Sequence, residues 1–462
     1  MKYILEDNIA LRTWKGFPYG MYVHGQRRAI AVSKEAYLQL FQCDGSVELP
    51  DNLILSNLLK CGYCKEAKQG ETLSSWQQHR FCQNRYFPEL NWAITGRCNY
   101  NCKHCFMAVD HAALTDEFTF EQCMTMLDEL ERCGIQNIYL NGGEPMLHPN
   151  FMEIVRECHK RRITIQSILT NASMLTKEML EEFTEMVISP KFYISFDGIG
   201  HHDWLRGVNG SEKKVLSAIK LCHEMGFQVK VQMNIHRGNL DTMMPTIRMM
   251  DAIGVEEMRV IRTTESPRWA QNAGDMCLSI EEYFEVGIQI AKQYAKENLK
   301  TSLTVWQFIN IYGKSKTYEL VPVKANHDTY CDSTPICKVN RRLVSVAPNG
   351  DLVPCTQMSG AMKYHGVHLG NVHQQSLQSL LYDSDYLKAV TATVGEFAVQ
   401  NETCGSCKWW KYCTGGCRAC AWALTGEQNG HDPSKCIFFN DGYSKRLQAV
   451  FEPYEFHCLN EF

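Results

Sequence analysis

The chain has 462 residues, with 45% hydrophobic, 21% charged and 11% aromatic residues and a formal net charge of −4. This composition excludes a mainly disordered chain, because it holds enough apolar residues to build a core. The small net charge excludes a global basic field for nucleic acid or for an anionic membrane surface. We therefore expect two or three packed domains, with neither nucleic acid nor membrane as a partner.

The count of 22 cysteines is the unusual feature of the composition. No apolar window approaches the roughly 18 residues of a membrane span. Glu6 and Asp7 lie where a signal peptide needs a basic and then an apolar region, so we expect a cytoplasmic protein. Cysteines in that compartment are thiols, catalytic groups or metal ligands rather than disulfides.

The first 70 residues predict a small unit of their own. Short apolar runs indicate strands at 3–5, 9–12, 22–24 and 29–32. Ser33 is placed to cap a helix that ends at Asp44-Gly45, and a second helix is expected near 52–60. The polar stretch 65–87 predicts a linker or a solvated helix, so we set a linker at 71–89.

From residue 90 the sequence alternates between short β-branched or aromatic runs and longer helical patterns. Strands are expected at 91–95, 137–140, 164–169, 191–196, 228–234 and 257–261. Helices are expected at 121–133, 151–160, 177–185, 214–225, 241–253 and 280–296. Six strand–helix units in series predict a parallel α/β sheet over 90–310. Such a sheet carries its chemistry at the carboxyl ends of its strands.

Beyond Ile309 this alternation ends, and we expect a separate domain at 311–462. Residues 331–436 are rich in cysteine, glycine and short turns, with little periodic apolar pattern. A region of that kind needs another source of stability, which bound metal can supply.

Three cysteines follow the first predicted strand of the sheet, in TGRCNYNCKHCFMA. Cys98, Cys102 and Cys105 lie within eight residues, so their thiolates can converge on one metal centre. A structural zinc site needs a fourth ligand. His104 is the available fourth ligand, but it lies between two of the cysteines. We therefore favour an iron–sulfur site with one open position over zinc.

This CxxxCxxC at the end of a first strand resembles the signature of radical S-adenosylmethionine (SAM) enzymes. The resemblance implies a partial (β/α)6 TIM barrel that binds a [4Fe–4S] cluster through Cys98, Cys102 and Cys105. In that family the remaining iron holds the amino and carboxylate groups of SAM, which is split to a 5′-deoxyadenosyl radical. Phe106 would pack near the adenine.

The ends of the next three predicted strands extend the resemblance. LNGGEP resembles the family's GGE motif, which contacts the SAM amino group; the residues carried over are Gly142, Gly143, Glu144 and Pro145. LTNAS and SFDG end the third and fourth strands, and the resemblance makes Thr170, Asn171, Ser195 and Asp197 candidates for SAM contacts. The alternative is that these polar residues only cap the helices that follow. Arg206, in HHDWLRG, is expected to reach a carboxylate, and Asn234 is a weaker candidate.

Eight further cysteines have a specific spacing in the C-terminal region. They are Cys331, Cys337, Cys355, Cys404, Cys407, Cys413, Cys417 and Cys436. Two structural zinc sites or two four-cysteine iron–sulfur clusters both fit this spacing. The array resembles the SPASM extension of radical SAM proteins, which carries two auxiliary [4Fe–4S] clusters. The resemblance assigns Cys331, Cys337, Cys355 and Cys417 to the first and Cys404, Cys407, Cys413 and Cys436 to the second.

Eleven cysteines remain outside these sets. Those in predicted helices are expected to be buried small hydrophobes, namely Cys123, Cys133, Cys158 and Cys222. Cys61 and Cys64 form a CxxC with no second half, so a metal role is not expected. Cys420 follows Cys417 closely and is the alternative ligand at that point, and Cys82 and Cys458 have no assigned role.

The N-terminal unit resembles the winged-helix peptide-recognition domain of peptide-modifying enzymes, most closely over IAVSKEAYLQLFQCDGSVEL. Such domains bind a leader peptide by adding it as a strand to an exposed sheet edge. The alternative is a generic winged helix or a packing extension of the barrel. DNA binding is not expected, because basic residues do not cluster on the second helix.

Together the resemblances imply a radical SAM/SPASM maturase of a ribosomally made precursor peptide. The expected product is a thioether or carbon–carbon cross-link, and the expected partners are the precursor peptide and an electron donor such as flavodoxin or ferredoxin. The alternatives are a protein-modifying enzyme of the anaerobic sulfatase-maturase type and a non-catalytic metal-cluster scaffold.

Overall fold

The computed structural model describes the chain apart from residues 108–115, 264–266, 325–331, 338, 428 and 461–462. Cys331, one of the expected cluster ligands, lies outside the described residues. No helix in the described part of the chain is long and apolar enough to cross a membrane.

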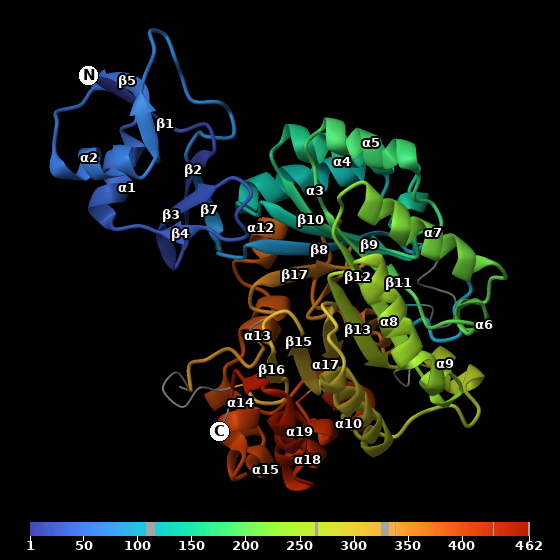
Figure 1. The fold of residues 1–462 in the computed structure, drawn as a ribbon. Coiled ribbons are helices and arrows are strands. Elements are labelled where there is room, and N and C mark those ends of the chain that lie inside the picture. The colour runs from blue at the N-terminus through green and yellow to red at the C-terminus, as the bar shows by residue number, and fades with distance from the viewer. Residues whose placement is uncertain (108–115, 264–266, 325–331, 338, 428, 461–462) are drawn as a thin grey trace.

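The N-terminal region contains two small sheets and two helices (Figure 1). Its strands are β1 (Lys2–Leu5), β2 (Ile9–Lys15), β3 (Phe17–Val23), β4 (Ile30–Ala31), β5 (Asp44–Glu48), β6 (Cys64–Glu66) and β7 (Arg80–Arg85), and its helices are α1 (Lys34–Phe41) and α2 (Leu53–Lys60). The sheet orders are β5-β1-β6 and β4-β3-β2-β7. Ser33 caps α1 and Asn52 caps α2 through their side chains, because each satisfies an otherwise unpaired N–H of the first turn. The winged-helix assignment of this region remains a prediction.

The stretch expected as a linker contributes a strand instead. β7 lies within 71–89 and pairs in parallel with β2, with Arg12 opposite Arg80. Cys82 and Asn84 are its buried positions, and the alternate residues Phe81, Gln83 and Arg85 are exposed. The sequence does not predict this strand, because its six residues, RFCQNR, are mostly polar and are typical of a solvated segment.

The N-terminal region is docked firmly on the helix that follows the first strand of the central sheet. Trp14 Nε1 donates to Cys133 O at 2.8 Å, and Tyr22 OH donates to Gly134 O at 3.0 Å. Both aromatic side chains are buried. Because Cys133 and Gly134 end that helix, two aromatic groups satisfy carbonyls that have no partner inside the helix. The region is therefore part of the packed body of the protein.

A twelve-stranded sheet forms the centre of the molecule. The six expected strands are present in order as β8 (Glu89–Thr95), β9 (Asn137–Gly142), β10 (Thr164–Thr170), β11 (Lys191–Ser195), β12 (Val229–Ile235) and β13 (Glu257–Arg262). The intervening helices are α3 (Phe120–Cys133), α4 (Phe151–Lys160), α5 (Lys177–Glu185), α6 (His202–Arg206), α7 (Ser211–Glu224), α8 (Met243–Ile253), α9 (Pro267–Asn272) and α10 (Ile280–Lys296). Neighbouring strands from β8 to β13 are parallel, as the alternation predicts.

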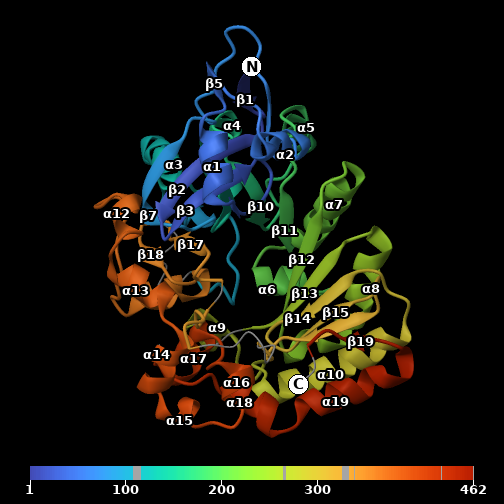
Figure 2. The same cartoon turned by 90° about the vertical axis from the view of Figure 1, so that its left-hand side faces the viewer.

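The C-terminal region continues the same sheet at both ends. β14 (Ser302–Val305), β15 (Ile309–Tyr312), β16 (Thr317–Leu320) and β19 (His457–Cys458) extend it beyond β13, while β17 (Leu343–Val346) and β18 (Leu352–Val353) extend it beyond β8. The remaining helices are α11 (Ser359–Tyr364), α12 (Leu377–Leu380), α13 (Asp385–Thr391), α14 (Val394–Gln400), α15 (Glu402–Gly405), α16 (Trp410–Cys413), α17 (Arg418–Thr425), α18 (Pro433–Asn440) and α19 (Tyr443–Phe451). Figure 2 shows α14 to α19 in the lower part of the molecule, with α12 and α13 at the left, where α12 lies near β7.

The two faces of the central sheet differ in chemistry. One alternating set of residues, such as Met258 and Val260, is buried in a single core beneath the helices. The other set is polar and faces the inside of the curve, as with Lys230, Glu257 and Arg259. The carboxyl ends of β8 to β13 open onto the segments that carry the candidate site.

Candidate active site

The segment after β8 brings three cysteines together. Cys98, Cys102 and Cys105 each lie close enough to the others to affect a pKa within the group. Burial raises the pKa of Cys98 to about 12, and burial also raises that of Cys102. Buried thiols without a bound cation hold their protons, so a cluster that binds here displaces them.

Two side chains donate hydrogen bonds toward these sulfurs. Arg206 Nη1 lies 3.7 Å from Cys102 Sγ, and Asn171 Nδ2 lies 3.8 Å from Cys98 Sγ. Both donors come from other strand–helix connections of the sheet. Donors around a metal-binding thiolate fix its orientation and stabilise its negative charge.

The GGEP segment packs directly on the backbone that leads to the cysteines. Gly143 N donates to Thr95 O at 2.9 Å, and Glu144 N donates to Arg97 O at 2.8 Å. A Cβ atom on Gly142 would lie 2.0 Å from Thr95 O. Only glycine fits this close approach of two backbones, so the motif sets the position of the cysteine segment.

The Glu144 carboxylate accepts hydrogen bonds from groups of the protein itself. It accepts from Thr170 Oγ1 at 2.8 Å and from Asn171 N at 2.8 Å, and its side chain is fully buried. Burial raises its pKa to about 7, against the lowering effect of these bonds. Thr170 and Glu144, two of the predicted SAM contacts, therefore join β9 to β10. Pro145 begins the turn that follows.

Asp197 and Arg206, both predicted from the sequence, form a buried ion pair. Arg206 Nη2 donates to Asp197 Oδ1 at 3.1 Å, and Asn234 N donates to the same oxygen at 2.9 Å. Burial by itself would raise the pKa of Asp197, but the Arg206 charge and a hydrogen bond from His202 together hold the pKa well below its usual range. The carboxylate that Arg206 reaches belongs to the protein itself, and its expected role in cofactor binding stays a prediction.

Ser195 ends β11 on the polar face of the sheet and is half-buried. Phe106 follows the last cysteine and leaves 37% of its surface exposed. Their roles toward SAM remain predictions.

His104 is a residue of this site that the sequence-based analysis considered only as a zinc ligand. Its side chain is buried, its Nδ1 has no partner among the described residues, and burial lowers its pKa to about 3. The neutral ring is therefore part of the wall around Asp197 and Arg206, which also affect its pKa. Its sequence position between Lys103 and Cys105 does not predict that its ring is buried beside Asp197 and Arg206.

The described C-terminal cysteines lie in two groups, and their assignment to two clusters stays a prediction. The pKa of Cys355 is raised to about 12, first by burial and then by Cys417 and Cys337. Cys404, Cys413 and Cys436 raise one another's pKa in the same way, each to about 11, and Cys407 contributes to two of these shifts. No group of three or more His, Cys, Asp or Glu side chains in the described ranges is placed to hold a single metal ion.

Cys420 lies against Cys417. The two thiols share a hydrogen bond, which lowers the pKa of one thiol and raises that of the other. Only Cys417 of the two affects Cys355. The assignment of Cys417 as the ligand stays a prediction, with Cys420 as the alternative.

The other cysteines have structural positions. Cys123, Cys133, Cys158 and Cys222 are fully buried, which confirms their assignment as small hydrophobes. The CxxC at 61–64 does not act as a pair, because Cys61 is exposed and Cys64 is buried against the Cys43 thiol.

Comparison with known families identifies these two cysteine-bearing regions. The family model described as the radical SAM superfamily matches residues 92–250, and the SPASM model, an iron–sulfur cluster-binding domain, matches residues 337–408. The chain is a radical SAM protein with a SPASM domain.

Several curated proteins resemble this radical SAM protein over three quarters of its length. An AdoMet-dependent heme synthase from Methanosarcina barkeri is 24% identical over 76% of this chain and 96% of its own. A PqqA peptide cyclase from Bradyrhizobium diazoefficiens is 25% identical over 74% of this chain and 84% of its own.

Solved structures share the fold. Streptococcus suis SuiB bound to its precursor peptide SuiA aligns with 94% of this chain and 99% of its own, with a TM-score of 0.62 and 13% identity. The protein anSMEcpe, with AdoMet and a peptide bound, aligns with 78% of this chain and 98% of its own, with a TM-score of 0.57 and 15% identity.

The residues present fit the cofactors of this family, which are SAM, a [4Fe–4S] cluster and auxiliary iron–sulfur clusters. The three thiols of the first group carry hydrogen-bond donors suited to thiolates, and the Gly142-Gly143 backbone leaves no room for a side chain. The eight C-terminal positions supply thiols alone, the ligand set of iron–sulfur clusters. Seven of them are described.

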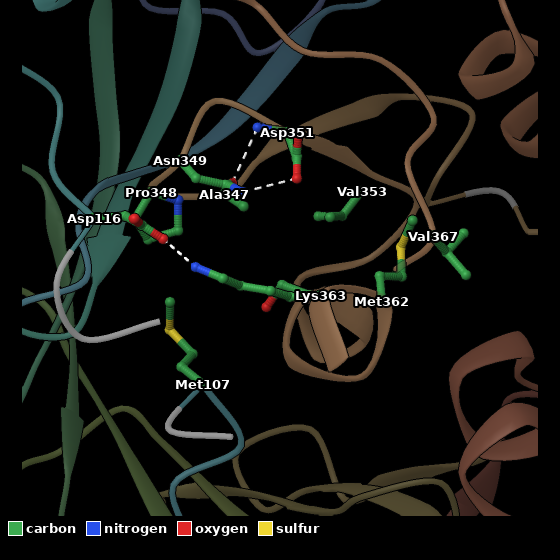
Figure 3. Close-up of a pocket in the computed structure, with 11 residues that line it drawn as sticks. Met107, Asp116, Ala347, Pro348, Asn349, Asp351, Val353, Met362, Lys363 and Val367 are labelled. Atoms are coloured by element: carbon green, nitrogen blue, oxygen red, sulfur yellow. Dashed lines mark hydrogen bonds and ion pairs between the residues drawn. The ribbon is translucent and has the colours of Figure 1, made fainter. Parts of the chain in front are cut away.

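A polar bridge joins the radical SAM and SPASM domains beside the site. Asn141 donates to Asn91, and Asn91 donates to Thr356, which follows Cys355. Figure 3 shows a second bridge, the ion pair between Asp116 and Lys363. It lines a cavity of about 20 Å³, roughly the space of one water molecule, so the cavity is a seam between domains and not a ligand site.

Proposed function

We propose that this radical SAM protein modifies a ribosomally made precursor peptide and forms an intramolecular cross-link, either a thioether or a carbon–carbon bond. The observation that carries the proposal is the N-terminal region docked on α3. The structural likeness to peptide-bound SuiB covers 94% of this chain, whereas the heme synthase match covers 76%. The PqqA peptide cyclases among the relatives also act on a peptide.

Cys98, Cys102 and Cys105 would hold a [4Fe–4S] cluster, which when bound would supply the electron that splits SAM to methionine and a 5′-deoxyadenosyl radical. The protein's own contribution is positioning. Arg206, held by Asp197, directs its charge at the cysteine segment, and the Gly142-Gly143 backbone keeps that segment in place. The auxiliary clusters suit an oxidative cross-link, because two electrons leave the substrate and need an acceptor.

The N-terminal region is proposed to bind the leader of the precursor. β4 pairs with only two residues of β3, so part of the outer side of β3 is open for an added strand. The ring of Tyr19 in β3 lies 5.4 Å from that of Tyr37 in α1, and α1 presents Leu38 and Phe41 to solvent with about half of each residue exposed. A leader strand along β3 would lie beside this helix.

The test measures KM and kcat of two enzyme variants with the full precursor, whose leader the N-terminal region is proposed to bind. Phe41→Asp should raise the KM for the full precursor about tenfold and leave its kcat unchanged, because docking supplies effective concentration rather than chemistry. Val187→Asp, at a position that is 91% exposed on the barrel, is the control. Equal KM values for the two variants would show that the N-terminal region only packs against the barrel.

Two other readings keep specific outcomes. A protein-modifying activity of the sulfatase-maturase type would alter one residue of a folded protein and form no cross-link. A metal scaffold would make no 5′-deoxyadenosine, and a zinc form would lack the absorbance near 400 nm that iron–sulfur clusters show and dithionite bleaches. Mass spectrometry that finds the loss of two hydrogen atoms per cross-link in the peptide supports the proposal.

A further inference from the structure

Arg259 stands on the polar inner face of the sheet, in the middle of β13. Its neighbours along the strand, Met258 and Val260, point into the core on the opposite face. Gln232 of β12 and Thr304 of β14 lie beside it in register. Ser195 is in register with Gln232, so this row begins at the strand end that borders the radical SAM site.

The Arg259 side chain is half-buried, and within the described parts of the chain no carboxylate forms an ion pair with it. Its Nε is buried without a hydrogen bond. Glu257, the nearest acidic residue on the strand, is bound by Lys230. Partial burial of a cation that has no ion-pair partner costs free energy, which a bound carboxylate would offset.

Trp306 supports this guanidinium from one side. The Arg259 Cζ atom lies 4.5 Å from the ring centroid. The backbone of Trp306 is itself fixed. Its amide N–H donates to Val260 O at 2.9 Å, and Tyr283 OH donates to its carbonyl oxygen at 2.8 Å. Stacking holds the guanidinium plane still and leaves its N–H edges to bind a ligand.

We propose that Arg259, stacked on Trp306, binds a carboxylate of the peptide substrate, either an acidic side chain or the C-terminus. A planar guanidinium matches a carboxylate with two parallel hydrogen bonds, and the register places it within the face that leads to Ser195. The subsite would fix the core peptide beside the radical. This inference rests on the proposed peptide substrate.

The first measurement separates a binding residue from a structural one. Arg259→Met should have a melting temperature equal to or above that of the wild type, because an unpaired charge is removed. Arg248→Met, which breaks an exposed ion pair with Glu297, is the matched control. A melting temperature that falls well below the control would show that Arg259 holds the fold and would overturn the inference.

The second measurement uses the precursor peptide. Arg259→Met should raise the peptide KM on the order of 30-fold, with unchanged iron content and unchanged peptide-free SAM cleavage. Arg259→Lys should recover part of the loss. One Asp→Asn or Glu→Gln change in the core peptide should raise the peptide KM of the wild-type enzyme as much as Arg259→Met does. The same peptide change should not raise the KM of Arg259→Met further. A wild type indifferent to every acidic change and to amidation of the C-terminus would overturn the inference.

A raised KM for SAM in Arg259→Met, with the peptide KM unchanged, would place the SAM carboxylate at Arg259 and also overturn it. Failure of the proposed function gives a different result. The wild type would then modify no precursor peptide, while a stabilised Arg259→Met variant would still mark a binding group.

Discussion

Arg206 Nε lies 2.5 Å from Asp197 Oδ2, and the same guanidinium reaches Cys102 Sγ at 3.7 Å. One buried ion pair therefore connects the end of β11 to the cysteine segment. The pair fixes a positive charge beside thiolates that carry a cluster, which makes it the electrostatic centre of the site.

Asp197→Asn should lower stability by about 3 to 5 kcal/mol, because Arg206 would stay buried without its counter-charge. The exposed pair of Arg156 and Glu182 is the control, where Glu182→Gln should cost about 0 to 1 kcal/mol. Denaturant unfolding of both variants measures the difference. Equal losses would contradict the role of the buried pair.

Glu144 predicts a pH dependence. Its pKa is raised from 4.5 to about 7, so its folded form prefers the proton. Its contribution to stability is full below about pH 4.5 and is lost as pH rises to 7, by about 3 kcal/mol in total. Glu144→Gln cannot ionise, so its unfolding curve should lack this slope between pH 5 and 7. A slope equal to that of the wild type would assign the effect to other groups.

The cluster assignment predicts iron contents. Three four-iron clusters give about 12 iron atoms per chain after anaerobic reconstitution. Replacing Cys98, Cys102 and Cys105 together by alanine should remove about a third of the iron and abolish 5′-deoxyadenosine formation. Cys61→Ser, at an exposed thiol, should change neither quantity. A triple variant that still cleaves SAM would refute the assignment.

The contact between Cys417 and Cys420 predicts that the two thiols differ in effect. Cys417→Ala should open one iron of the first auxiliary cluster and change its electron paramagnetic resonance signal. Cys420→Ala should leave the iron content unchanged, because only a hydrogen bond is lost. If Cys420→Ala loses a cluster and Cys417→Ala does not, the ligands are exchanged. A signal that shifts only with a Cys-bearing peptide would favour sulfur coordination by the substrate.

Trp14 tests the docking of the N-terminal region. Trp14→Ala should cost about 3 to 5 kcal/mol, since it removes a buried ring and a hydrogen bond to Cys133 O. Val187→Ala, at an exposed position, should cost less than about 0.5 kcal/mol. Deletion of residues 1–70 should for the same reason destabilise the barrel, so point variants are the better probe of leader binding. A neutral Trp14→Ala would indicate a loosely attached region.

Local patterns determined the central fold. The helices at 151–160, 177–185 and 280–296 appear with the predicted bounds. Their apolar spacing and capping residues act within a few turns of chain, so they are legible in sequence. β7 was missed because its partner β2 lies some 65 residues away and selects a polar segment as a strand.

The sequence by itself determined that this protein carries a radical SAM and a SPASM domain, because cysteine spacing and strand ends are local patterns. Only the tertiary structure decided how the side chains of these domains are used. It placed Glu144 against Thr170, paired Arg206 with Asp197, and left the Arg259 Nε without a hydrogen bond among the described residues. Partners in a folded protein are chosen by distance in space, and no local pattern records which buried charge is satisfied.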